Sequence, residues 1–206
     1  MANAFDVAEF IITISKDFAH IDTSNVKLQK LLYCAQGRYL ARTGNPLFDA
    51  PIEAWADGPV VKNVYEKYLV YGSDPLPSPS RNMDSALNAQ EFDALVDVIG
   101  DYGFCSASEL RDITQLDGSP WANAFSSKDA RPEISNSELQ TYFTTVNREP
   151  TFKERMEKQG VTVVGRLGPD GMYVMPASEY DPDDDIYESD YAALKKDCAT
   201  RLTATI

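Results

Sequence analysis

The strongest structural signal in this sequence is a helix-start pattern that occurs at three places. At each place a polar residue is followed three positions later by a glutamate, and apolar residues stand just before the polar residue and four positions after it. The polar residues are Asn88, Ser106 and Ser135. This is the spacing of a capping box with a hydrophobic staple, in which side chains satisfy the free N–H groups of a first helical turn. The pattern predicts three helices and favours a mainly α-helical fold.

Hydrophobic spacing predicts further elements in the first part of the chain. Residues 6–18 and 25–43 each carry apolar residues at helical intervals. We expect Asn25 to cap the second of these helices and Gly44 to end it. Residues 52–55 are expected to form a short extended segment.

Glycine and proline mark the remaining boundaries of this part. Because proline is well tolerated in a first helical turn, Gly58-Pro59 is expected to open a third helix that ends near Gly72. Pro120 is expected to open a short helix for the same reason. The stretch 73–86 holds three prolines among serines and is expected to be a surface loop.

The sequence divides into two parts near Pro150. The seventh helix is expected to end near Val146, which gives a helical domain over residues 1–148. Residues 149–206 are expected to form an accessory segment with a short helix, a β-hairpin over 161–175, an acidic loop and a C-terminal helix. A two-stranded hairpin alone is marginal in water. It therefore either packs on the helical domain or pairs with a partner in trans, and both alternatives stay open.

The charge balance restricts the class of partner. The 206 residues include 19 Lys and Arg against 32 Asp and Glu, a formal net charge of −13. This excess of acid argues against direct nucleic-acid binding and against docking on an anionic membrane, and it is compatible with a basic protein partner. No apolar run approaches the ~20 residues of a membrane span, and the N-terminus lacks the basic segment of a signal peptide. A cytoplasmic location is therefore expected.

The sequence offers little support for catalysis or metal binding. It has no glycine-rich phosphate loop and no CxxC pair, and its one histidine is His20. The acidic run 181–185 lacks the glycine and glutamate that a calcium loop requires at its sixth and twelfth positions. We expect no metal, no cofactor and no enzymatic activity. An enzyme would need a cleft around His20, Glu53 or Asp57.

Two sets of residues are candidate partner contacts. Lys27, Lys30 and Arg38 lie along one flank of the helix 25–43 and form the densest cationic stripe of an acidic chain. The stripe is either an exposed face that keeps an amphipathic helix soluble or a contact surface for an acidic patch. Val163 and Tyr173 belong to the expected hairpin and are the second set.

Four segments carry a family resemblance. They read VKLQKLLYCAQG over 26–37, GNPLF over 44–48, IEAWADGPVV over 52–61 and VY over 64–65. This order resembles the hallmark of the Panacea domain, a family of bacterial and phage-associated antitoxins. The resemblance covers about residues 5–146 and implies a helical domain there.

The motif has two departures and a physical interpretation. Cys34 stands where the family usually has a second tyrosine, and Gln115 stands where many members have a histidine, which favours binding over catalysis. The motif residues are interpreted chiefly as parts of the fold, with apolar side chains as core, Gly58-Pro59 as a helix start and Gly37 as a point of close helix approach. They are Leu28, Leu31, Leu32, Tyr33, Gly37, Trp55, Gly58, Pro59 and Trp121.

The resemblance implies a function as well. It implies an antitoxin that neutralises a cognate toxin by direct protein binding, with toxins that block translation among the known partner classes. Two alternatives stay open: an adaptor that delivers the toxin to a protease, and an enzyme that reverses a toxin's modification. The cationic stripe, the loop 73–86 and the accessory segment are the expected contact regions.

Overall fold

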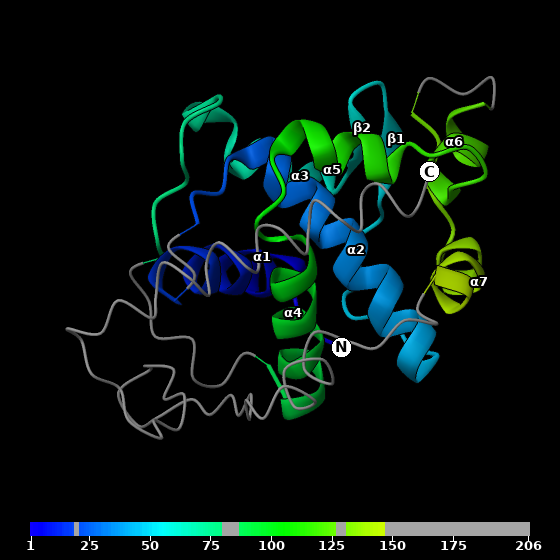
Figure 1. Ribbon diagram of the computed structural model, residues 1–206, viewed down its shortest axis with the longest axis horizontal. Coiled ribbons are helices and arrows are strands. Elements are labelled where there is room, and N and C mark those ends of the chain that lie inside the picture. The colour runs from blue at the N-terminus through cyan, green and yellow to red at the C-terminus, as the bar shows by residue number, and fades with distance from the viewer. Residues whose placement is uncertain (19–20, 80–86, 127–130, 147–206) are drawn as a thin grey trace.

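Helix α2, Asn25–Thr43, is the element on which the others pack (Figure 1). The computed structural model describes residues 1–18, 21–79, 87–126 and 131–146. Within this part, α1 and α4 lie on one side of α2 and α7 lies on the other. Every residue from Lys27 to Gly37 is buried. A helix covered on all its faces forms the centre of a core, so α2 is the axis of this fold.

The order of elements confirms a mainly α-helical fold with a short extended segment. They are α1 Ala4–Thr13, the π-helix η1 Ile14–Phe18, α2, β1 Glu53–Trp55, β2 Gly58–Val60, α3 Lys62–Lys67, the 3₁₀-helix η2 Leu69–Tyr71, α4 Ala89–Tyr102, α5 Ala107–Thr114, α6 Pro120–Phe125 and α7 Asn136–Val146. None of the helices in the described ranges is long and apolar enough to cross a membrane. The accessory segment 149–206, with Val163 and Tyr173, and His20 lie outside the described residues.

The helix starts follow their sequence signals closely. Asn88 and Ser106 form complete capping boxes, in which the glutamate three residues later accepts a bond from the cap's backbone N–H. At the third start the Glu138 carboxylate accepts a bond from the Ser135 hydroxyl, so the bonding differs from a capping box although α7 begins as predicted. The cap of α2 is Ser24 and not Asn25, whose amide instead donates to the Tyr65 carbonyl at 2.9 Å.

The expectation that Gly58-Pro59 opens a helix is wrong. These residues begin β2, which pairs antiparallel with β1 so that Trp55 lies opposite Gly58. Gly58 has a φ of 108°, and a Cβ there would lie 2.7 Å from the Lys30 ammonium nitrogen. Only glycine meets both requirements without strain. A tight turn joins β1 to β2, and helix α3 starts only after β2, at Lys62.

The glycine at position 37 allows α2 and α7 to pack closely, because it has no side chain. The Phe143 ring of α7 lies directly over Gly37 of α2, where any Cβ would collide with it. Phe143 is also in edge-on contact with Tyr33, with ring centroids 5.6 Å apart. This confirms Gly37 as the point of close helix approach. Leu28, Leu31, Leu32 and Tyr33 are buried as expected.

We predict that Gly37→Ala destabilises the chain even though alanine is the better helix former. The new methyl group overpacks the α2–α7 contact, which is expected to lower the free energy of unfolding by about 2 kcal/mol. Urea unfolding of the full chain followed by circular dichroism measures this. Adding Phe143→Ala to Gly37→Ala should cost less than the sum of the single changes, because the truncated ring leaves room. A Gly37→Ala variant as stable as the wild type would contradict the packing described here.

Candidate partner-binding surface

The cationic side chains of α2 point into the protein. The Lys27 ammonium donates to the Gly103 carbonyl at 2.6 Å, and the Lys30 ammonium donates to the Pro59 carbonyl at 3.2 Å. Their residues are 7% and 1% exposed. Burial lowers the pKa of each lysine to about 8, because removal from water disfavours the charged form. The expectation of a solvent-facing stripe is therefore wrong for both residues.

Arg38 is also engaged within the fold. Its guanidinium forms an ion pair with Asp101 of α4 and lies 4.7 Å from the centroid of the Tyr102 ring. One turn further along α2, Arg42 forms an ion pair with Asp97, which also lies on α4, at 2.7 Å. The two arginines thus join α2 to α4, and Lys30 joins α2 to β2, which leaves little of this flank for a partner.

Two glutamines of α2, which the sequence did not single out, bind the backbone of distant loops. The Gln36 carbonyl accepts from the backbone N–H groups of Leu47 and Phe48 at 3.0 and 3.1 Å, and its amide donates to the Phe48 carbonyl at 3.0 Å. The Gln29 carbonyl accepts from the Val61 N–H at 2.9 Å. Their seven-residue spacing puts both on one helical face, and a pair of amides among leucines is the signal that could have identified them.

The β1–β2 hairpin is held in place by side chains from two other helices. Trp121 of α6 donates its indole N–H to the Trp55 carbonyl at 2.9 Å, and Gln115 donates to the Ala56 carbonyl at 3.1 Å. Trp55 itself is half-buried, against the expectation of a core residue. Its ring lies 5.2 Å from Tyr65, and the Arg131 guanidinium lies 4.1 Å above it. The hairpin is thus a fixed feature of the surface.

The candidates for catalysis lie apart or are engaged. Glu53 accepts the indole N–H of Trp55 at 2.7 Å, and Asp57 is exposed in the hairpin turn. Over the described residues no group of three or more His, Cys, Asp or Glu side chains is arranged to hold a metal ion. His20, the third candidate, lies outside the described residues.

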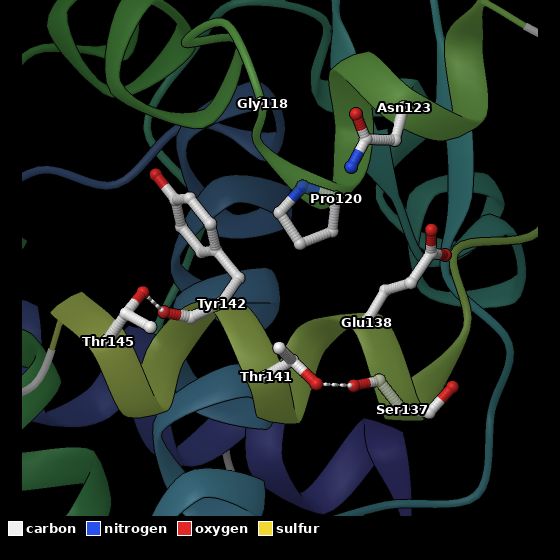
Figure 2. A pocket seen from close by; sticks show the side chains of 8 residues that line it. All are labelled: Gly118, Pro120, Asn123, Ser137, Glu138, Thr141, Tyr142 and Thr145. Carbon is white, nitrogen blue, oxygen red and sulfur yellow. Dashed lines mark hydrogen bonds between the residues drawn. The ribbon is translucent and has the colours of Figure 1, made fainter.

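An open hollow of about 390 Å³ lies between α6 and α7 (Figure 2). Tyr142 and Pro120 stand on opposite sides of it. Thr141 and Thr145 donate their hydroxyls to carbonyls of α7 itself, at 2.9 and 2.6 Å, so these groups are already engaged. The lining residues are Gly118, Pro120, Asn123, Ser137, Glu138, Thr141, Tyr142 and Thr145.

The exposed apolar residues of the described surface include three that are consecutive, and these form η2. Its three residues, Leu69, Val70 and Tyr71, are 55%, 84% and 37% exposed. We call them the apolar turn. The segment lies at the outer edge of the molecule in Figure 1, in the teal part of the chain that follows α3. Contiguous exposed apolar side chains are characteristic of protein-binding surfaces.

The chain is similar to known proteins over part of its length. Residues 28–122 match the family described as Antitoxin SocA-like, Panacea domain. The chain is also similar to Antitoxin SocA of Caulobacter vibrioides (strain NA1000 / CB15N), with 34% identity over 117 residues. That match spans 49% of this chain and 59% of the relative, so the shared region is little more than half of the relative's length. No solved structure matches the chain significantly.

We predict a pH-dependent contribution of Lys30 to stability. Below about pH 8 the lysine is charged in both the folded and the unfolded chain, so the cost of its burial is fully present. Between about pH 8 and its ordinary pKa of 10.5 only the unfolded chain holds the proton, so this cost falls as the pH rises. From pH 8 to pH 10 the wild type should gain about 2 kcal/mol relative to Lys30→Met. Urea unfolding at both pH values measures the difference.

Lys62→Met is the matched control for this experiment. The Lys62 side chain is 51% exposed on the surface of α3, so this change removes a lysine without touching the buried Lys30. This variant should keep the pH dependence of the wild type. A Lys30→Met variant with the wild-type pH dependence would contradict the buried, charged state of Lys30.

Proposed function

This chain carries a SocA-like Panacea domain, the domain of an antitoxin family, and on that premise we propose that it neutralises a cognate toxin by direct protein–protein binding. The observation that carries the proposal is the family match over residues 28–122, because these residues include most of α2 and the hairpin that α2 holds. In this proposal the protein acts in the cytoplasm, binds no cofactor and catalyses no reaction.

The interior of the domain supports binding over chemistry. The polar side chains of Lys27, Lys30 and Gln36 in the motif bond to backbone carbonyls of the same chain. A general acid or base needs to reach a substrate proton, and these groups are turned inward. The proposed work of the domain is therefore done by its outer surface.

The net charge supports a basic partner. A chain of −13 attracts a positively charged protein and speeds the encounter with it. Proteins that act on RNA or on the translation machinery carry basic surfaces. We therefore place the cognate toxin in this class, and we propose no direct contact of this chain with nucleic acid or with a membrane.

Co-expression tests the proposal. The product of the neighbouring gene, expressed alone, should stop growth, and co-expression of the full chain should restore it. Affinity purification of the tagged gene product should then recover both proteins as a stable complex. The free energy of binding in the complex accounts for the neutralisation, so rescue should require at least as much of this chain as of the toxin.

Three results would contradict direct neutralisation. Absence of rescue and of a complex would remove the proposed function. Rescue accompanied by a shortened toxin half-life after synthesis is stopped would indicate delivery to a protease. Rescue by substoichiometric amounts of this chain in a purified system would indicate an enzyme.

A further inference from the structure

The apolar turn exposes three consecutive apolar or aromatic side chains. Leu69, Val70 and Tyr71 are consecutive, and each is a large apolar or aromatic residue. The other strongly exposed apolar residues of the described part are isolated in the sequence; they are Met1, Val26, Phe125 and Val146. Isolated exposure is ordinary for a folded protein, whereas a contiguous patch indicates a contact surface.

The apolar turn lies between two buried residues and has backbone hydrogen bonds of its own. Tyr68, directly before the turn, is 6% exposed, and Leu76, five residues after its end, is 1% exposed. Within it, the Tyr71 N–H donates to the Tyr68 carbonyl at 3.2 Å and the Gly72 N–H donates to the Leu69 carbonyl at 3.1 Å. A surface that is fixed before binding loses less conformational entropy when the partner arrives.

The start of α2 lies beside this surface. The Leu76 N–H donates to the Thr23 carbonyl at 2.9 Å, and Ser24 forms an antiparallel bridge with Pro75. Val26 follows in the first turn of α2 and is 37% exposed. The exposed Val26 therefore lies in a helix whose start is bridged to the segment that follows the apolar turn.

The charges around the apolar turn leave an acidic border. Lys62 pairs with Glu66 at 3.9 Å, and Lys67 pairs with Glu9 at 2.5 Å. Asp74, three residues after the turn, is exposed and donates its N–H to the Tyr71 carbonyl at 2.9 Å. The border thus has two basic and three acidic side chains in a chain that is acidic as a whole.

We propose that the apolar turn is the main contact of this chain with its toxin, and that it enters an apolar depression bordered by lysine or arginine side chains. This inference rests on the proposed function and specifies the surface that performs it. The apolar side chains supply the binding free energy, and the acidic border selects a basic rim and speeds the encounter. The hollow between α6 and α7 lacks such a contiguous exposed apolar row.

Val70→Asp tests the apolar contact in the full chain. Val70 is 84% exposed, so the change should leave folding intact, which circular dichroism and urea unfolding verify. Binding to the tagged product of the neighbouring gene, measured by surface plasmon resonance, should weaken tenfold or more, because a charge is placed in the apolar centre of the interface. Val146→Asp makes the same substitution on α7 and should keep affinity within twofold of the wild type.

The outcomes separate this inference from the proposed function. If the wild type binds its partner and Val70→Asp binds equally well, the apolar turn is not the contact and the antitoxin function stands. Equal losses in Val70→Asp and Val146→Asp would also overturn the assignment. If the wild type itself binds nothing and rescues nothing, the proposed function fails and the inference fails with it.

Asp74→Lys tests the predicted basic rim. Reversing this charge should slow association several-fold at low salt, and the difference from the wild type should shrink as added salt screens the charges. Glu138→Lys, which makes the same reversal at an exposed residue of α7, should change association less. Faster association of Asp74→Lys than of the wild type would overturn the basic rim and indicate an acidic one.

Discussion

The structure depends on polar side chains that leave a buried helix and bind the backbone of distant segments. Since α2 is covered on all its faces, each polar group on it needs a partner inside the protein. The Gln36 amide bonds to the backbone of the loop at Phe48, and the Gln29 carbonyl bonds to the backbone just before α3. The Lys30 ammonium bonds to the backbone of the β1–β2 hairpin. One helix thus fixes the course of three loops, because leaving any of these groups unpaired would cost stability.

The local parts of this arrangement could be predicted from the sequence, whereas the pairings over long distances could not. The starts of α4 and α5 depend on bonds between residues three positions apart, and that spacing is visible in the chain. The strand at Gly58-Pro59 depends on Lys30, which lies in another element. A proline after a glycine fits a helix start and a tight hairpin equally well, and only the tertiary partner decides between them.

Exposure was the least predictable property of the candidate site. Lysines on a helix usually face water, so Lys27 and Lys30 were expected on the surface, and both are buried against backbone carbonyls. Leu69 and Val70 show the reverse case. They lie in a segment with the residue types of a core, but no described element covers them. Hydrophobic spacing identifies an apolar face and does not tell whether another segment of the chain packs on it.

The buried lysines and the exposed apolar residues indicate that different residues hold the fold together and bind a partner. Most of the motif residues on α2, such as Leu31, Lys30 and Gly37, are buried within the described part of the fold. Buried side chains cannot distinguish one partner from another except by positioning what lies outside them. Specificity is a difference between affinities at the surface. Under the proposed function, the features that discriminate among toxins therefore belong to exposed residues such as Val70, which lies after the motif, and to the charges around them.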